Sequence, residues 1–240
     1  MASGKKLTQA VILAGGQGTR LRPLTLTTPK PLIEVAGKPF VQHLIEHLRD
    51  EGIEEVVFLT SYLHEKFPLA FDDGSKLGVH MRYAISDLDD ESGTRLKKAE
   101  PLLDNSFLLL YGDNFWPMPV QEIVAAHQAY TPLVTMVAYA NKNGDSEYGF
   151  DHNLTVRDGL LTHYGPRGSG ENAIDVGTFI VEKEALEHMP EGNPVFQRDL
   201  VGALIPKAEV YAFVSDMPYC FITSPDLIPR AEEYIKKYKK

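Results

Sequence analysis

The residues with the clearest chemistry are glycines and cations grouped near the N-terminus. Positions 13–32 read LAGGQGTRLRPLTLTTPKPL and directly follow the apolar run Ala10–Leu13. Glycines leave backbone N–H groups open to a ligand because no β-carbon shields them, and such amides suit a polyphosphate. Arg20 can grip two phosphate oxygens, and Lys30 is a point charge between two prolines that restrict the backbone. The pattern predicts a phosphate-binding loop.

The two common phosphate-loop motifs do not account for this stretch. The dinucleotide fingerprint needs a third glycine, whereas Gly16-Gln17-Gly18 is followed by Thr19-Arg20-Leu21. The nucleoside-triphosphate P-loop closes with Gly-Lys-Ser or Gly-Lys-Thr, which this loop lacks. A tight turn without a ligand would also use glycines. It would not need Arg20 and Lys30 in a proline-restricted segment.

The segment GGQGTRLRPLTLTTPKPL resembles the signature of the sugar-1-phosphate nucleotidylyltransferases, or NDP-sugar pyrophosphorylases. The reaction that this resemblance implies is attack of a sugar-1-phosphate oxygen on the α-phosphorus of a nucleoside triphosphate, with release of pyrophosphate. Arg20 would neutralise the leaving phosphates, and Lys30 would bridge the α-phosphate and the incoming phosphate. The residues implied in nucleotide binding are Leu13, Ala14, Gly15, Gly16, Gly18, Thr19, Gly93 and Thr94. Thr94 can also serve as the N-cap of a following helix.

The resemblance also implies a Mg²⁺ ion. Asp113 follows the apolar run Phe107–Tyr111, as the family's catalytic metal aspartate does, and a carboxylate oxygen suits Mg²⁺. A second metal aspartate usually precedes the last helix of the family, but our alignment places Phe221 at that position. Either Asp216, five residues upstream, is the second ligand, or one carboxylate and the triphosphate oxygens hold the ion.

Residues of the second half resemble the family's sugar-side contacts more loosely. Tyr148, Gly149, Asp175 and Gly177 fall where the family places contacts to the sugar. The family's Glu-Lys-Pro, whose lysine meets the sugar phosphate, is absent, and Arg167 can supply the missing cation. Hexose and heptose phosphates are the expected acceptors.

The elements that position these residues are predicted to be strands alternating with helices. Apolar runs separated by helical patterns are typical of βαβ units. We expect an α/β fold with three layers, in which helices flank a mixed, mostly parallel sheet, and the resemblance implies the Rossmann-like fold of nucleotide-diphospho-sugar transferases. One domain would span residues 1–240, with a nucleotide-binding part at 1–140 and an acceptor-binding part at 141–240.

The expected strands lie at 10–13, 56–59, 79–84, 107–111, 133–140, 174–181 and 210–214, with a hairpin at 154–164 turning at Asp158-Gly159. Helices are expected from 40 to Gly52, at 120–130, from 182 and from 225.

Composition limits the classes of partner. The formal net charge is −9, so a general nucleic-acid or anionic-membrane surface is not expected. Apolar runs stay short of the roughly 20 residues that span a bilayer, and we expect a cytoplasmic protein. Cys220 is the only cysteine, which predicts a small buried side chain rather than a disulfide. A homo-oligomer is compatible with this sequence.

Three alternatives remain open. A glycosyltransferase would need an Asp-x-Asp metal motif, and Asp87-Leu88-Asp89 matches only within an acidic stretch. A cytidylyltransferase could use the same chemistry on a non-sugar phosphate or phosphonate. A nucleotide-sugar sensing subunit could have lost catalysis with the aspartate at position 221.

Overall fold

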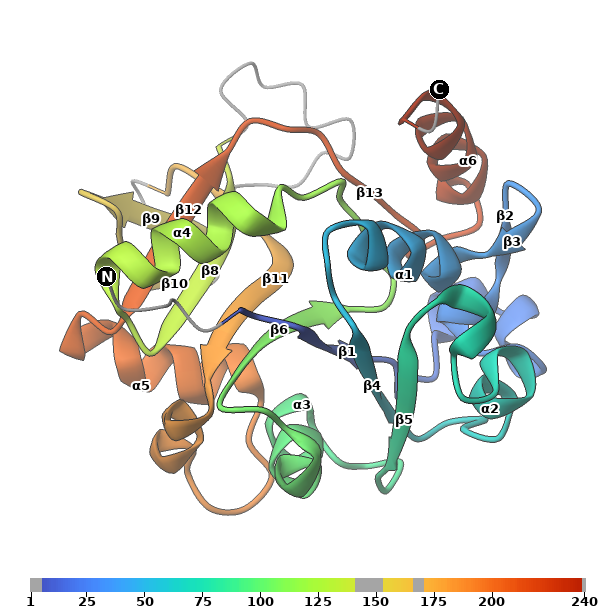
Figure 1. The fold of residues 1–240 in the computed structure, drawn as a ribbon, viewed down its shortest axis with the longest axis horizontal. Coiled ribbons are helices and arrows are strands. Elements are labelled where there is room, and N and C mark those ends of the chain that lie inside the picture. Colours follow the sequence, from blue (N-terminus) through green and yellow to red (C-terminus); the bar gives the residue numbers. More distant parts are fainter. Residues whose placement is uncertain (1–5, 141–152, 166–170, 239–240) are drawn as a thin grey trace. The chain divides into compact units, whose positions relative to one another are not determined.

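A computed structural model describes residues 6–140, 153–165 and 171–238 of the chain. The contacts within it divide the chain into two units, each assembled from separate parts of the sequence. Unit A comprises residues 8–89, 110–119 and 219–240, and unit B comprises residues 1–7, 90–109 and 120–218. Figure 1 shows the elements of both. The expected division into a nucleotide-binding part and an acceptor-binding part stays a prediction.

Parallel strands form the centre of unit A. The order is β5-β4-β1, and both pairs are parallel, with Ile12 opposite Phe58 and Phe58 opposite Tyr83. All five residues of β1 are buried, as expected for a parallel strand covered on both faces. The strands of this unit are β1 (Gln9–Leu13), β2 (Glu34–Val35), β3 (Lys38–Pro39), β4 (Glu55–Thr60), β5 (His80–Ile85), β7 (Asn114–Phe115) and β13 (Cys220–Phe221).

Unit B contains the antiparallel part of the main sheet. Its order is β11-β8-β12-β10-β9, in which β12 is parallel to β8 and the other pairs are antiparallel. The predicted hairpin is confirmed, and its turn residues Asp158 and Gly159 both have positive φ. Strand β6 (Ser106–Tyr111) contributes residues to each unit. The other strands are β8 (Val134–Tyr139), β9 (Leu154–Arg157), β10 (Leu160–Tyr164), β11 (Ile174–Glu182) and β12 (Val210–Ser215).

The main sheet therefore has nine strands, and the predicted class, a mixed and mostly parallel sheet with flanking helices, is confirmed. Each strand expected from an apolar run is present, with its ends shifted by one or two residues at most. Cys220 is a buried free thiol, as predicted. No helix within the described ranges has the length and apolar character that crossing a membrane requires.

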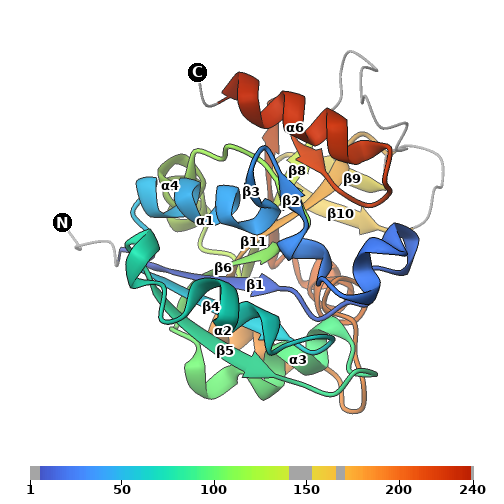
Figure 2. The same ribbon diagram turned by 90° about the vertical axis from the view of Figure 1, so that its right-hand side faces the viewer.

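Helix α1 (Phe40–Asp50) in unit A is followed by a glycine at its C-terminal end. Its buried residues recur at helical spacing, and the chain leaves it through Gly52 at φ 93°. The Gly52 N–H donates to Arg49 O at 2.9 Å, and the Ile53 N–H donates to Leu48 O at 2.9 Å. These two bonds are a Schellman motif, a C-terminal cap that confirms the predicted end of the helix at Gly52. The unit also contains α2 (Lys66–Phe71) and α6 (Leu227–Tyr238), which packs on β2 and β13 (Figure 2).

The helices of unit B correct two expectations. Helix α3 (Ser92–Lys98) begins before Thr94, so Thr94 is not its N-cap, and the Thr94 hydroxyl instead donates to Asn193 Oδ1 at 2.8 Å. The helix expected from Glu182 is a 3-10 helix, Lys183–His188. Helix α4 (Val120–Tyr130) packs on β8, β11 and β12, and the short α5 (Gly202–Leu204) follows a π-helical segment, Phe196–Val201.

The positive φ at Gly52 predicts a measurable cost for a side chain. Gly52→Ala should lower the free energy of unfolding by about 1–2 kcal/mol, since an L-residue is strained in the left-handed region. Gly202→Ala is the matched control, because Gly202 has φ −57° and nothing closer than 4.0 Å to its added Cβ. Urea titration measures both. Equal losses for the two variants would contradict the cap.

Candidate active site

The glycine-rich loop presents a run of main-chain donors. The Ala14 N–H donates to Leu59 O at 2.9 Å, and the next loop amide with a recorded acceptor is Leu21, which donates to Gly18 O at 2.9 Å. Between them, the N–H groups of residues 15–20 have no acceptor anywhere in the described part of the chain. Backbone N–H groups are obligatory hydrogen-bonding groups, and several in succession make a concave anion site.

Gly18 is the residue of this loop that cannot carry a side chain. It has φ 60° and ψ 36°, and an added Cβ would lie 2.9 Å from Thr25 Cγ2 and 3.1 Å from Lys30 Cβ. Gly16 differs, since an added Cβ there would meet nothing within 4 Å. The close approach at Gly18 packs the start of the loop against the segment that carries Lys30.

An ion pair joins two of the predicted catalytic residues. Lys30 Nζ donates to Asp113 Oδ2 across 83 residues of sequence, and the side chains are only 14% and 21% exposed. Lys30 opens a 3-10 helix (Lys30–Leu32), and Asp113 lies between β6 and β7. Gly112 brings the two segments together, because its N–H donates to Leu13 O at 3.0 Å and an added Cβ would lie 3.2 Å from Pro31 Cγ.

Arg20 differs from Lys30 in being free to meet a ligand. It lies in the 3-10 helix Thr19–Leu21, is exposed, and has no ion pair or hydrogen bond to any residue that the structure describes. The neighbouring Arg22 points its guanidinium at the Gln17 side chain, with a long 3.5 Å contact. A guanidinium beside unpaired amides makes the mouth of this loop locally cationic in a chain of net charge −9.

Strand β13, which precedes the last helix, lies beside Asp113 but contributes no carboxylate. Strand β13 pairs with β7 so that Phe221 is opposite Asn114, and the Ile222 N–H donates to Asp113 O at 3.1 Å. Phe221 is buried. The position that the alignment assigns to the family's second metal aspartate is therefore a buried phenylalanine opposite Asn114, the residue after Asp113.

The predicted sugar-side residues of unit B are held by internal hydrogen bonds. Asp175 Oδ1 accepts from the Gly177 N–H at 2.7 Å, and Oδ2 accepts from the Tyr164 hydroxyl at 2.9 Å. Burial raises the pKa of the Asp175 carboxyl, and these two hydrogen bonds oppose the shift. Gly93, predicted with Thr94 to bind nucleotide, also lies in unit B, where an added Cβ would lie 2.7 Å from Pro194 O; the nucleotide role of these two residues stays a prediction. The sugar-contact role of Asp175 and Gly177 stays a prediction.

Other predicted residues stand apart from this geometry. Tyr148, Gly149 and Arg167 lie outside the described residues. Asp216 belongs to unit B, just after β12, and its role as a metal ligand stays a prediction. The residues that unit A brings together around the loop are Leu13, Ala14, Gly15, Gly16, Gly18, Thr19, Arg20, Lys30 and Asp113.

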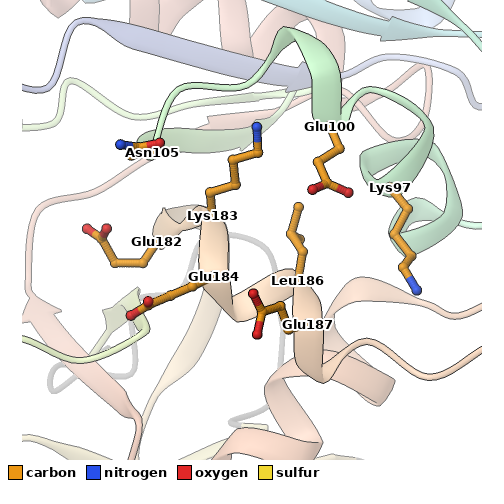
Figure 3. A pocket seen from close by; sticks show the side chains of 8 residues that line it. All are labelled: Lys97, Glu100, Asn105, Glu182, Lys183, Glu184, Leu186 and Glu187. Atoms are coloured by element: carbon orange, nitrogen blue, oxygen red, sulfur yellow. The ribbon is translucent and has the colours of Figure 1, made fainter.

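A pocket of about 650 Å³ in unit B is a poor candidate for a polyphosphate (Figure 3). Its four glutamates outnumber its two lysines, so its charge would repel an anion. It contains none of the predicted site residues. The lining residues are Lys97, Glu100, Asn105, Glu182, Lys183, Glu184, Leu186 and Glu187.

Sequence reasoning missed two residues that shape the loop. Thr25 is buried and donates its hydroxyl to Gly18 O at 2.9 Å, and Gly112 admits Pro31 beside Asp113. A sequence signal existed for each, because Thr25 lies within the signature and Gly112 directly precedes Asp113. Neither signal says which distant atom the residue contacts.

Comparisons with known proteins show which sequences and structures this chain is similar to. The family model described as nucleotidyl transferase matches residues 9–157. A UTP–glucose-1-phosphate uridylyltransferase of Synechocystis is 31% identical over 83% of this chain and 54% of its own length. A mannose-1-phosphate guanylyltransferase of Mycobacterium tuberculosis is 29% identical over 85% of this chain and 58% of its own length. This chain therefore spans little more than half of these relatives.

A solved structure shares the fold. The inositol-1-phosphate CTP transferase from T. maritima superposes with a TM-score of 0.78 at 20% identity, covering 99% of this chain and 98% of the other.

The Lys30–Asp113 pair predicts energetic coupling between the two side chains. In a double-mutant cycle of Lys30→Met and Asp113→Asn, the losses of stability in the two single variants should add up to more than the loss in the double variant. The reason is that each single variant leaves a partly buried charge without its partner. We expect a coupling of about 1–3 kcal/mol from urea unfolding. The control cycle uses Lys236 and Glu232, which are 62% and 40% exposed and should couple by about 0.3–0.5 kcal/mol. Similar couplings in both cycles would contradict the buried pair.

Proposed function

Because this chain belongs to the nucleotidyl transferase family, we propose that it joins a nucleoside triphosphate to a sugar-1-phosphate, giving an NDP-sugar and pyrophosphate. The observation that carries the proposal is the row of unpaired amides at 15–20, with Arg20 among them and the Lys30–Asp113 pair beside them. Both curated relatives are named for a hexose-1-phosphate, which supports the hexose among the expected hexose and heptose phosphate acceptors.

Binding of the triphosphate would rest on the main chain of the loop. The N–H groups of residues 15–20 would donate to phosphate oxygens, and Arg20 would neutralise the β- and γ-phosphates as they leave as pyrophosphate. Neither interaction needs a rearrangement of existing hydrogen bonds among the described residues, since these donors are unpaired. Preorganised donors of this kind stabilise charge in the transition state.

Lys30 would act at the bond being made. Its ammonium would lie between the α-phosphate and the acceptor phosphate, reducing the repulsion between two anions that must approach each other. No covalent enzyme intermediate is required, so catalysis would consist of positioning and charge stabilisation. The prolines on either side of Lys30 and its pairing with Asp113 restrict where the ammonium can go.

Asp113 would hold Mg²⁺ together with oxygens of the triphosphate. Its carboxylate is a hard oxygen donor and remains partly exposed, which fits the ion. Within the described ranges, no three His, Cys, Asp or Glu side chains lie together as a ready-made cage. Mg²⁺ suits such a site because it usually keeps several waters and substrate oxygens as ligands. Asp216 remains the proposed second ligand, and the ion would supply neutralisation of phosphate charge.

Pyrophosphate release tests the reaction and the role of Asp113 together. With Mg²⁺ and a panel of five nucleoside triphosphates against sugar and non-sugar phosphates, we expect release in at least one sugar-phosphate combination. Asp113→Asn should lower turnover by about 100-fold or more, while circular dichroism shows a retained fold. Asp87→Asn removes a carboxylate of the Asp-Leu-Asp stretch and should leave turnover within about twofold. Full activity of Asp113→Asn would contradict the site.

The same panel separates the alternatives. Release confined to CTP with a non-sugar phosphate would favour a cytidylyltransferase. Nucleotide binding without release in any combination would favour the sensing subunit. A glycosyltransferase would consume a finished nucleotide-sugar, release no pyrophosphate and respond to Asp87→Asn.

Lys30 should matter more for turnover than for binding. Lys30→Met is expected to reduce kcat by about 100- to 1,000-fold, because the ammonium would act mainly on charge in the transition state. The nucleotide Kd from calorimetry should change by less than about fivefold. Lys38→Met is the control, since Lys38 pairs with Glu46 at 2.7 Å elsewhere in unit A. A loss confined to nucleotide affinity would assign Lys30 to ground-state binding instead.

A further inference from the structure

Thr25 is a buried polar residue whose hydroxyl bonds to the glycine-rich loop. Its side chain is fully buried, and its hydroxyl donates to Gly18 O at 2.9 Å. A buried hydroxyl normally finds a partner because leaving it unpaired is costly. Here the partner is the main chain of the loop seven positions earlier, at the point where Gly18 adopts a left-handed backbone.

The hydrogen bonds to Gly18 determine where the next amide points. Gly18 O accepts from both the Thr25 hydroxyl and the Leu21 N–H, each at 2.9 Å. In a planar trans peptide the N–H points opposite to the C=O. The Thr19 N–H therefore points away from Thr25, and it is one of the amides without an acceptor in the described part of the chain.

The methyl group of Thr25 fixes the same peptide sterically. Thr25 Cγ2 would lie 2.9 Å from a Cβ added to Gly18, and Lys30 Cβ would lie 3.1 Å from it. Thr25 and Lys30 thus bracket Gly18 from the segment that follows the loop. One residue supplies both a directional bond and a packing contact, and substitution can separate the two.

We propose that Thr25 is a positioning residue for nucleotide binding: its hydroxyl orients the Gly18–Thr19 peptide so that the Thr19 N–H donates to a phosphate of the nucleoside triphosphate. The proposal rests on the function given above. It predicts that Thr25 affects the affinity for the triphosphate and does not affect the affinity for the phosphate acceptor. If Thr25 only filled space, its substitutions would change the free energy of unfolding according to the volume removed, and the affinity for the triphosphate would not depend on the hydroxyl.

Three variants separate the hydroxyl from the methyl group. Thr25→Val keeps the shape and removes the donor, whereas Thr25→Ser keeps the donor and removes the methyl. Thr27→Val is the control, because Thr27 is an exposed threonine two positions away with no hydrogen bond recorded among the described residues. The measurements are nucleoside triphosphate Kd by calorimetry without acceptor, both KM values, and the midpoint of urea unfolding.

The expected result is a split between the two substrates. Thr25→Val should raise the Kd and KM for the triphosphate about tenfold, with the KM for the sugar-1-phosphate within twofold of wild type. Thr25→Ser should stay within about threefold on every measure, and Thr27→Val should match wild type. A Thr25→Val protein that binds like wild type overturns the proposal, as does a Thr25→Ser protein that binds as weakly as Thr25→Val.

Two further outcomes keep the test decisive. If Thr25→Val does not fold, Thr25→Ala removes the same donor without a second methyl at the hydroxyl position, and wild-type affinity in that variant overturns the proposal. If the wild-type chain binds a triphosphate but releases no pyrophosphate, the proposed reaction fails while the affinity comparison still decides the role of Thr25. Absence of triphosphate binding by the wild type overturns both.

Discussion

The site in unit A depends on the contact between Lys30 and Asp113. A partly buried ammonium and carboxylate are each costly to desolvate, and together they gain little net stability. Their value lies in geometry, because leaving either one alone is worse than keeping both in place. The pair holds the segment after the glycine-rich loop against the end of β6, and Gly112 admits this approach by lacking a side chain. Gly18 packs closely against Lys30 Cβ, so its position depends on where the ion pair holds Lys30.

Much of this arrangement was predictable from the sequence. Continuous apolar runs such as the one in β1 indicate strands buried on both faces, and Gly52 indicates the end of a helix, since these signals depend on neighbouring residues alone. The signature 15–32 indicated the loop, Arg20 and Lys30. The role of Thr25 was not predictable, because a threonine in a signature does not say which carbonyl it bonds. The family resemblance assigned Lys30 and Asp113 to one site, but their ion pair was not predicted from the sequence.

The acceptor side was less predictable for physical reasons. The Asp175 carboxylate could have been read as a ligand contact, yet both its oxygens accept hydrogen bonds within unit B. The bond from Tyr164 joins β10 to β11, two strands that are not neighbours in the sheet order, so the sequence pattern alone does not predict it. At position 221 the sequence itself differs from the family pattern, and the register of β13 against β7 places the buried Phe221 opposite Asn114, the residue after Asp113. In the proposed site, the loss of an acidic residue at position 221 would leave more of the metal coordination to the substrate or to Asp216.

The proposed recognition through main-chain amides would have a consequence for how this loop can vary. Every residue except proline carries the same N–H group, so a change of side chain at an exposed position such as Gln17 or Thr19 leaves the donor itself in place. Insertions or deletions would displace all six donors at once. Changes in the length of the loop should therefore be tolerated less well than substitutions at its exposed positions. The exceptions are Gly18, which shapes the backbone path, and Arg20, whose side chain is proposed to contact the phosphates.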